Sequence, residues 1–564
     1  NLPMTGTLRD LPFVKNYHFA QAPFHRSWEL STNVSTNKNR GQALTTPKRN
    51  LTRYNRRIAN PSRAALALMY LDHYIGDDIL TSALKDIPKS SLSNALLKKQ
   101  LNLKTDKPLD WFFDHYIHLD NNVDMKLQGK KLNAETSRIQ ISSTHPDIAI
   151  PVKKIFGNGA QQTDWLLSQD LPFEKTYKNA DVKTFTVNEN HYIPEQQLNN
   201  NTFQHGNGLF RNNLKFRFLQ DISESGTALL LYKPEFAYNY YDGLLGGISI
   251  ANSSILANKY RFKFSPQYGV KRQQISGMGY VIADFYNENS SHHLTRINLF
   301  GSSYHYAPQL RYTVFTPSLI FYFRPKGIQN KERSSLQIRH VSIRLDDLPA
   351  EDERRGYGIS LASFQSRKGT ALDNFSYKIE AQMARNFKKL SLDSEYITYY
   401  GPNRRWTMRI FAGTFLSNSS NDSYYDFNVS RVNDYLFQYD LYGRSEAEGF
   451  FSQQYIKAEG ALRTTGNLTS ANQWLMTAQS ATTIWRWIEG YAEIGWVKSK
   501  FQTPETHWGT GITFNLVPDF FEVHFPIYNS NGAVYANNAY PKHIRFQLSL
   551  RPASLAKLFS RSWF

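Results

Sequence analysis

The chain has 564 residues, no cysteine, 34 tyrosines, 37 phenylalanines and a formal net charge of +19. This length predicts two or three folding units rather than one small core. The absence of cysteine excludes disulfides, zinc–thiolate sites and a cysteine nucleophile. No run of about 18 apolar residues occurs, which excludes transmembrane helices. Lys and Arg alternate with aromatic residues along predicted strands and form no patch, so we expect no nucleic-acid binding.

Residues 1–119 are predicted to be mainly helical from about residue 61 onward. The stretch "NPSRAALALMYLDHYIGDDILTSAL" (60–84) has apolar residues at helical spacing, with a proline in the first turn, where proline is tolerated. Gly76 marks a break between two helices. The stretch "KPLDWFFDHYIHL" (107–119) predicts one more helix, whose aromatic residues we interpret as a buried stripe.

Residues 120–195 change to short alternating segments, which predict a small β-sandwich. These segments are "VDMKLQG", "RIQISS", "IAIPVKKIF" and "KTFTV". The polar, Asn-rich stretch that follows predicts a linker over residues 196–213. The remaining residues, 214–564, form the last predicted domain.

From about residue 214 the pattern is strict two-residue alternation. In "FSYKIEAQMA" (375–384), apolar residues occupy one face and polar residues the other. "KYRFKF" (259–264) alternates in the same way, and so does "HIRFQLSL" (543–550), which we expect to be the closing strand with Phe546 on its apolar face. About 16 such segments occur, many near the length that a tilted strand needs to cross a bilayer.

Two further features favour a membrane barrel over a soluble sandwich. Charged residues occupy the polar face in the middle of strands, as expected for a polar lumen. Aromatic residues gather at strand ends in "YITYYG", "FAYNYYDG" and "TIWRWIEGY", as expected for an interfacial girdle. The predicted fold class is therefore mainly β: a transmembrane antiparallel barrel of about 16 strands, preceded by a helical segment and a small β-sandwich.

Three quoted segments of the first 200 residues resemble an M1-type (gluzincin) aminopeptidase: "ALALMYLDHYIGDDIL", "LDWFFDHYI" and "YIPEQQLNNN". The resemblance implies the C-terminal part of that peptidase's catalytic region. It aligns the degenerate segment Pro61, Ser62, Arg63, Ala64 and Ala65 with the family's Tyr-x-Lys-Gly-Ala pattern.

The alignment replaces the family's catalytic tyrosine by Pro61, which has no hydroxyl to stabilise an oxyanion. The family's His-Glu-x-x-His zinc motif does not occur in the chain. We therefore expect a pseudo-peptidase with no catalytic, metal-binding or cofactor-binding residues.

The remaining residues resemble the outer-membrane barrel that follows such peptidase domains in some Gram-negative bacteria. The segments that carry this resemblance are "FAYNYYDGL", "YLFQYDLYGRSEAEGFFSQQ", "NQWLMTA" and "GITFNLVPDFFEVHFPIYNSNG". The C-terminal arrangement is also similar to Omp85-type barrels. With an even strand number, both barrel ends lie on the periplasmic side, so we expect residues 1–200 in the periplasm.

The longest interruption of the strand pattern is the stretch 418–450, rich in Tyr and Asp. Its composition suits a partner-binding surface, and packing into the lumen is an equal alternative. The candidate partner residues are Tyr424, Tyr425, Tyr435, Tyr439, Tyr442 and Arg444. The strand count alone does not assign this loop to one side of the membrane. The basic tail "RPASLAKLFSRSWF" (551–564) ends in an aromatic residue, which suits recognition by barrel-assembly machinery.

Three functions compete. The first is a non-catalytic scaffold or polypeptide-binding subunit of an outer-membrane protein assembly or secretion complex. The second is an outer-membrane transport pore, and the third is a membrane-anchored zinc aminopeptidase whose catalytic half lies outside this chain. The expected partners are outer-membrane lipid, other outer-membrane proteins or lipoproteins, and a polypeptide ligand; no cofactor is expected.

Overall fold

The computed structural model describes residues 14–36, 40–76, 78–88, 90, 92–121, 123–133, 135–195, 197–204, 213–253, 258–287, 290–324, 331–346, 348–349, 352–370, 372–402, 404–420, 423–464, 469–517 and 521–548. The predicted basic tail (551–564) lies outside these residues. The chain divides into two compact units. The first unit comprises Asn1–Lys233 with Ile250–Lys263, and the second comprises Pro234–Ser249 with Phe264–Phe564.

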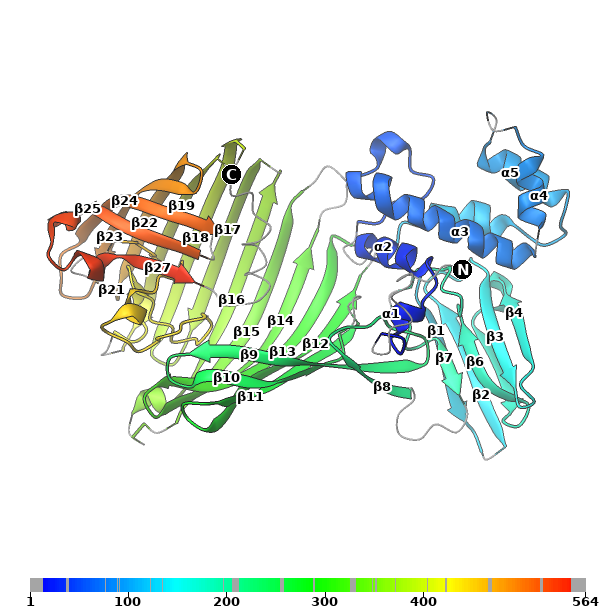
Figure 1. The fold of residues 1–564 in the computed structure, drawn as a ribbon, viewed down its shortest axis with the longest axis horizontal. Coiled ribbons are helices and arrows are strands. Elements are labelled where there is room, and N and C mark those ends of the chain that lie inside the picture. The colour runs from blue at the N-terminus through cyan, green and yellow to red at the C-terminus, as the bar shows by residue number, and fades with distance from the viewer. Residues whose placement is uncertain are drawn as a thin grey trace. The chain divides into compact units, whose positions relative to one another are not determined.

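The helices of the first unit lie early in the chain (Figure 1). They are α1 (His18–Gln21), α2 (Arg26–Thr36), α3 (Asn60–Ile75), α4 (Ile79–Lys85) and α5 (Asn94–Asn102). Pro61 occupies the first turn of α3, and the helix ends at Gly76, whose φ of 108° suits glycine. The predicted helix over 107–119 is a π-helical turn, Trp111–His115, followed by a 3₁₀ turn, Tyr116–His118. No helix among the described residues is long and apolar enough to cross a bilayer.

Two antiparallel sheets follow the helices and confirm the predicted sandwich. One sheet has the order β1 (Met125–Lys131), β2 (Thr136–Ser143), β5 (Phe173–Lys178). The other has the order β4 (Gln161–Leu166), β3 (Ile150–Phe156), β6 (Val182–Val187), β7 (Thr202–Gln204). The two sheets approach closely where β1 meets β7, because a Cβ on Gly129 would lie 2.2 Å from the Phe203 ring. β7 falls within the predicted linker, so this part of the linker is folded.

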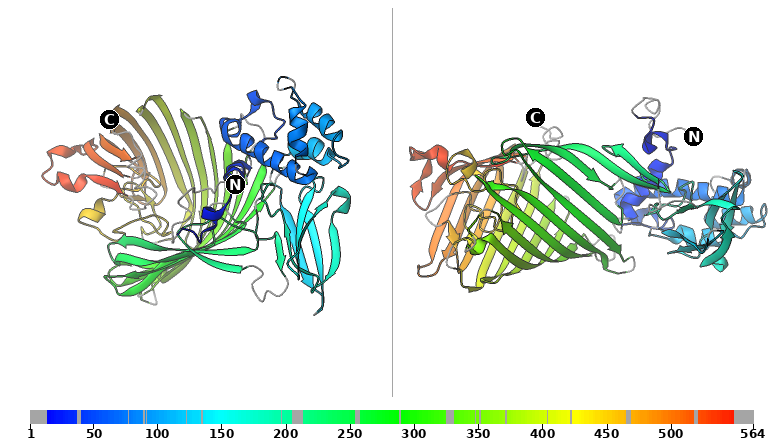
Figure 2. Two further views of the ribbon diagram at one scale, coloured as in Figure 1. Left: turned by 45° about the vertical axis from the view of Figure 1, so that its right-hand side comes forward. Right: turned by 90° about the horizontal axis from the view of Figure 1, so that it is seen from below.

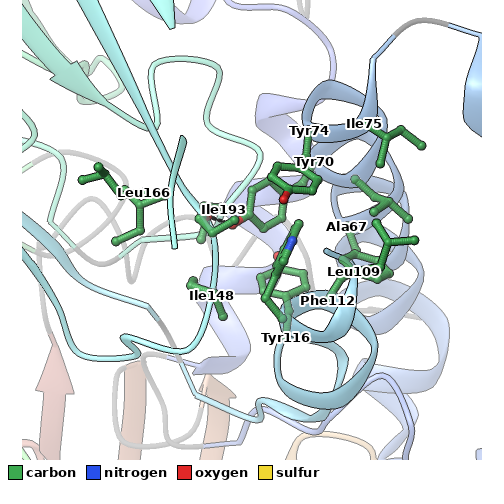
Figure 3. Close-up of a cluster of buried hydrophobic side chains, with 14 of the residues drawn as sticks. Ala67, Tyr70, Tyr74, Ile75, Leu109, Phe112, Tyr116, Ile148, Leu166 and Ile193 are labelled. Carbon is green, nitrogen blue, oxygen red and sulfur yellow. Dashed lines mark hydrogen bonds between the residues drawn. The ribbon is translucent and has the colours of Figure 1, made fainter. Parts of the chain in front are cut away.

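One hydrophobic core joins the helices to both sheets (Figure 3). Tyr70 of α3 is fully buried, and its ring centroid lies 4.8 Å from that of Trp111 and 5.1 Å from that of Tyr116. Tyr74 packs edge-on against Trp165 of β4 at 5.0 Å. Aromatic pairs in this geometry add stability beyond their buried area. The aromatic residues of the "DWFFD" stretch are therefore core residues, as predicted.

The remaining strands form the barrel sheet (Figures 1 and 2). They are β8 (Asn213–Phe218), β9 (Thr227–Asn239), β10 (Gly243–Ala251), β11 (Tyr260–Gly269), β12 (Gln274–Tyr286), β13 (His292–Ala307), β14 (Leu310–Phe323), β15 (Arg333–Leu345), β16 (Gly356–Gly369), β17 (Asp373–Met383), β18 (Phe387–Gly401), β19 (Arg404–Asn418), β22 (Trp474–Trp485), β23 (Ile488–Lys498), β24 (Glu505–Val517), β25 (Phe521–Asn529), β26 (Gly532–Ala533) and β27 (Arg545–Leu548). A small pair, β20 (Phe427–Asn428) and β21 (Ser470–Ala471), lies between β19 and β22 in sequence.

The strand order of this sheet is that of a closed barrel. Eighteen strands of the described residues belong to it, two more than the predicted 16. Two of its members are unusual: β26 has only two residues, and β8 runs parallel to β9. From β12 to β26, neighbouring strands of the barrel pair antiparallel, as predicted.

The barrel wall is apolar outside and polar inside. On β17, Phe375, Ile379 and Met383 are 45%, 43% and 55% exposed, whereas Glu380 and Gln382 are buried. A soluble protein would bury the first set, so this polarity is that of a membrane barrel. The closing strand departs from the prediction, because Phe546 is buried against Phe450, with ring centroids 4.3 Å apart.

We predict that Ile379→Arg destabilises the barrel by about 2–4 kcal/mol, because it places a charge on the lipid-facing surface of a strand. The control Ser376→Arg places the same side chain on the polar face of β17 and should cost less than about 1 kcal/mol. Urea unfolding of the chain in lipid vesicles measures both. Equal losses for the two variants would contradict the assigned polarity.

Candidate functional site

A small, solvent-open depression, called the cleft below, lies between α3 and the sandwich of the first unit. Tyr70 and His73 line it from the helix, and Lys153 and Thr163 line it from β3 and β4. The loop 188–192 closes the remaining side. Polar and aromatic groups therefore meet in one shallow depression of the surface.

Aromatic rings form one wall of this cleft. The exposed His73 ring lies edge-on to Trp165 at 5.2 Å and to Tyr192 at 5.9 Å. Opposite them, Lys153 Nζ donates to Glu189 Oε1 at 2.7 Å. The cleft thus has aromatic rings on one side and, at its rim, one charge of each sign joined in an ion pair.

The loop 188–192 has a strained backbone. Asn188 and His191 adopt left-handed conformations with φ of 48° and 55°, although neither is glycine. Such residues persist only where the surroundings fix them, and they concentrate at functional sites. Buried hydrogen bonds hold this loop. Asn188 Nδ2 donates to Ile193 O at 2.7 Å and to Glu195 Oε1 at 2.5 Å.

Glu195 is the centre of this network and is fully buried. Its carboxylate also accepts from Asn201 Nδ2 at 2.6 Å and from Met125 N at 2.9 Å. Glu195 thereby joins the cleft loop to β1 and to the Asn-rich stretch that the sequence predicted to be a linker. Because its neighbours in this network are donors, the site requires a group with two acceptor oxygens.

A charged cluster fixes the other side of the loop. It consists of His25, Arg26, Glu29, His191 and Glu224. His25 Nε2 donates to Asn190 O at 3.0 Å, and His191 Nε2 lies 3.3 Å from Glu224 Oε2. Arg26, which is buried, pairs with Glu29 and lies 3.6 Å from Glu224.

The two carboxyl groups of this cluster shift in opposite directions. Burial alone would raise the pKa of Glu224, but the hydrogen bond from His191 and the charge of Arg26 lower that pKa to about 2. Burial raises the pKa of Glu29, which Arg26 offsets only in part. Glu224 therefore stabilises the fold above the ordinary glutamate pKa, and this contribution is lost as pH falls toward 2.

The five residues of the degenerate peptidase segment lie at the start of α3, and none of them lines the cleft. Pro61 is exposed, Ser62 and Arg63 are buried, and Ala64 and Ala65 are half-buried. The Arg63 guanidinium lies 5.9 Å from the centroid of the Tyr116 ring. The structure thus gives these residues a packing role. Among the described residues, no group of three or more His, Asp or Glu side chains could hold a metal ion.

A second candidate site lies inside the barrel of the second unit, where residues 423–464, called the inner segment below, cover the polar face of the wall. Tyr435 Oη donates to Gln382 Oε1 at 2.7 Å, and Gln382 belongs to the buried face of β17. Arg409 of β19 donates through Nη2 to Asp393 Oδ2 and to Glu459 O, both at 2.7 Å. The inner segment therefore occupies the lumen, which is the second of the two alternatives for the loop 418–450.

Lys389 anchors the inner segment to β18. Its ammonium lies 4.5–5.4 Å from the ring centroids of four aromatic residues. These residues are Phe387, Phe415, Phe427 and Tyr435. Lys389 Nζ also donates to Tyr435 Oη at 3.2 Å and lies 3.8 Å from Glu459 Oε1. A desolvated cation within such a cage gains several favourable cation–π contacts.

Two more residues of the wall bind the inner segment, each through more than one hydrogen bond. Glu493 of β23 accepts from the backbone N–H of Arg463 at 3.0 Å and of Thr464 at 2.7 Å. Arg545 of β27 donates through Nη2 to the carbonyls of Ser430 and Gln454, both at 3.1 Å. The inner segment is thus bound to widely separated strands of the wall.

The six predicted partner residues come together in this lumenal packing instead of on a free surface. Tyr425, Tyr435 and Tyr442 are buried. Tyr424 Oη lies 2.9 Å from Tyr357 Oη of β16, and Tyr439 N donates to Asp434 Oδ2 at 2.9 Å. Arg444 pairs with Asp434, and its guanidinium lies 5.0 Å from the centroid of the Phe437 ring.

The strand directions place the inner segment at one end of the barrel. It follows β19, which runs in the same direction as β13, β15 and β17 because the intervening pairings are antiparallel. The opposite end carries the connections that follow β12, β14, β16, β18 and β22, all of which are much shorter than the stretch between β19 and β22. The longest connection between described strands of the barrel therefore lies at one end, with connections of different lengths beside it.

The sequence did not identify Lys389 or the cleft loop. The stretch "FKKLSL" (387–392) does contain a signal for Lys389. Side chains of a strand alternate between its two faces, so one of the two adjacent lysines must point into the barrel. For the loop 188–192 the sequence signal is weak, because asparagine at position 188 tolerates a left-handed backbone conformation but does not require it.

No protein-family model matches the chain, and no curated protein matches it. Solved structures similar to it include CdiB from Acinetobacter baumannii, BamA from Haemophilus ducreyi lacking POTRA domains 1–3, and CdiB from Escherichia coli. Their identities are 12%, 8% and 11%, with TM-scores of 0.29, 0.32 and 0.32. The matches cover 53%, 84% and 55% of this chain and 57%, 96% and 63% of those chains. At these identities and TM-scores the matches carry no argument about this chain. Its assignment as a barrel rests on the strands described above.

We predict that Glu195→Gln destabilises the first unit by about 1–3 kcal/mol, because the new amide group would face buried N–H donors. The control Glu189→Gln removes a charge from an exposed residue at the cleft rim and should change stability by less than about 0.5 kcal/mol. Thermal unfolding of the full chain in detergent, followed by near-ultraviolet circular dichroism, measures both. A neutral result for Glu195→Gln would contradict the assigned donors.

We also predict that Lys389→Met lowers the free energy of releasing the inner segment from the wall by about 1–3 kcal/mol. The variant loses the cation–π cage and the contact with Glu459. The control is Lys388→Met, on the opposite face of the same strand. Planar-bilayer conductance and protease cleavage between residues 431 and 446 are the measurements. Both should rise for the Lys389 variant only; unchanged values would show that the cage does not hold the segment.

Proposed function

We propose that the chain is a non-catalytic outer-membrane barrel protein of a Gram-negative bacterium. In this proposal it is a scaffold or polypeptide-binding subunit of an outer-membrane protein assembly or secretion complex. The observation that carries the proposal is the filled lumen: residues 423–464 bind the inner wall through Lys389, Arg409, Glu493 and Arg545. A lumen packed in this way disfavours the alternative of a solute pore and leaves the surfaces outside it for binding.

The cleft of the first unit is the proposed polypeptide-binding surface. Its aromatic wall and charged rim suit a peptide segment with one apolar side chain. In outer-membrane barrels short turns face the periplasm and long connections face outward. The end opposite the long connection between β19 and β22 is therefore the proposed periplasmic end, and the inner segment enters from the outside.

Residues 1–119 are proposed to be a pseudo-peptidase. The position that the resemblance assigns to the catalytic tyrosine is Pro61, an exposed first-turn residue of α3 without a hydroxyl. The buried Arg63 that follows packs against Tyr116. The alternative of an anchored aminopeptidase would require a catalytic half from outside this chain and a different donor at position 61.

The test uses a fluorescently labelled, urea-unfolded porin precursor as the probe and the full chain in lipid nanodiscs. We expect binding on the order of micromolar, together with low ion conductance in planar bilayers. The double variant His73→Ala/Tyr192→Ala should weaken precursor binding about tenfold, because it removes the aromatic wall of the cleft.

The matched control is Leu103→Ala, which removes an exposed apolar side chain remote from the cleft lining. It should leave precursor binding unchanged. Absence of precursor binding combined with a steady open-channel conductance would overturn the proposal and favour the transport pore.

A further inference from the structure

One segment of the first unit departs from the prediction that Lys and Arg form no patch. Between Glu29 and Asp72 the chain has no Asp or Glu, whereas it has eight Lys or Arg residues there. Five of these cations lie within residues 48–57, called the basic segment below. All five have exposed side chains: Lys48, Arg49, Arg53, Arg56 and Arg57. Such a cluster creates a positive potential that attracts anions.

The cations of the basic segment have no acidic partner within the chain. None of the five forms an ion pair with a carboxylate among the residues that the structure describes. By contrast, Lys98 of the same unit pairs with Asp110, and Lys153 pairs with Glu189, both at 2.7 Å. The charge of the basic segment is therefore open to an anion from outside the chain.

Buried side chains hold the backbone of the basic segment from its inner side. Gln42 Nε2 donates to Asn50 O at 3.0 Å, and Thr52 N donates to Gln42 Oε1 at 2.8 Å. Asn55 Nδ2 also donates to Gln42 Oε1 at 2.8 Å, and both side chains are buried. The segment is thus preorganised, so an anion that binds it does not first have to order a flexible chain.

The positions of three arginines are unfavourable for the helix that carries them. Arg53, Arg56 and Arg57 lie in or just before the π-helical turn Asn55–Ala59, which leads into α3 and has no acidic residue in its first turn. The N-terminal end of a helix carries a partial positive charge and disfavours cations. Helix stability therefore does not explain these arginines. Their spacing of three and four residues places them on one face.

Apolar side chains continue this exposed face along α3. Pro61 and Leu68 follow Arg57 at helical spacing. Leu68 is 40% exposed, and Ile58, the neighbour of Arg57, is 44% exposed. A helix face that only meets water has polar residues at such positions. Cations at one end and exposed apolar side chains along the same helix are typical of a helix that lies in a membrane interface.

We propose that the basic segment and the outer face of α3 form a docking surface for the headgroups of anionic phospholipids. The lipid phosphates pair with the five cations, and Ile58 and Leu68 enter the boundary between headgroups and acyl chains. The second unit is a membrane barrel, so the first unit is covalently tethered to a bilayer and meets lipid at a high effective concentration. A nucleic acid carries the same charge but would leave Ile58 and Leu68 in water. The inference does not depend on polypeptide binding at the cleft.

Vesicle flotation tests this surface with the full chain in nanodiscs of phosphatidylcholine. The probes are vesicles of phosphatidylcholine alone and vesicles that also contain the anionic lipid phosphatidylglycerol. We expect the chain to float with the anionic vesicles only, and this binding to weaken as salt rises. The triple variant Arg53→Gln/Arg56→Gln/Arg57→Gln should lose about a hundredfold in affinity, because each cation near an anionic surface contributes about fivefold.

The matched control is Lys126→Gln/Lys130→Gln/Lys131→Gln, which removes the same charge from exposed residues on the two faces of β1. It should leave vesicle affinity nearly unchanged. Ile58→Ser keeps every cation and should lower the affinity severalfold, because it removes an apolar side chain that the lipid buries. Near-ultraviolet circular dichroism shows whether each variant is folded.

A second measurement detects docking on the bilayer that holds the barrel. Asn50→Cys introduces one thiol into the basic segment, because the natural chain has no cysteine. Its alkylation by N-ethylmaleimide should be severalfold slower in nanodiscs that contain phosphatidylglycerol than in those of phosphatidylcholine alone. Alkylation of Leu103→Cys, at an exposed residue outside the docking surface, should proceed at the same rate in both.

Three results would overturn the inference. The first is equal flotation with both kinds of vesicle together with equal alkylation of Asn50→Cys in both kinds of nanodisc. The second is an equal loss of affinity in the two triple variants, which would mean that net charge alone binds the lipid. The third is binding of a single-stranded RNA without binding of anionic vesicles, which would assign the surface to nucleic acid.

Discussion

The structure of the barrel depends on one constraint: charges on the inner wall must have partners once the lumen is filled. A buried charge without a partner costs several kcal/mol, whereas a paired and hydrogen-bonded charge is tolerated. The inner segment supplies these partners. It offers backbone carbonyls to Arg409 and Arg545, and backbone N–H groups to Glu493. The wall and the inner segment are therefore a single polar network, and neither is complete without the other.

The lipid-facing surface of the barrel must, by contrast, be apolar. Apolar residues on alternate positions meet the bilayer, and the same alternation places Lys389 inside and Lys388 outside on β18. The aromatic cage around Lys389 also shows that the lumen is not uniformly polar. Apolar side chains of both the wall and the inner segment surround the cation, so its charge is stabilised by ring faces and by Glu459.

The periodic part of the fold could be predicted from the sequence, because its signal is local. Alternation over 375–383 predicted the exposed face of β17, and helical spacing with Pro61 predicted α3. The non-local parts could not be predicted. The sequence predicts Phe546 on the apolar, lipid-facing side of the closing strand, whereas in the structure Phe450 covers it. The stretch around Asn201 reads as a linker because its polar residues are used for hydrogen bonds to Glu195, a partner that composition does not reveal.

The same limit applies to the sites. The six aromatic and basic residues of the stretch 418–450 were recognised as a contact surface, but sequence alone left open whether their partner was another protein or the barrel's own wall. The answer depends on strands distant in sequence, such as β16, which brings Tyr357 to Tyr424. The cleft in the first unit depends on the left-handed loop 188–192, which is held by local hydrogen bonds from Asn188 and by His25, a residue distant in sequence.

The same constraint limits how far the inner segment can move. Moving it would break its contacts with β18, β19, β23 and β27 together and would leave buried charges unpaired. Because these contacts lie on strands that are distant in sequence, no single one of them can be released without loss to the others, and the inner segment is held as one body with the wall.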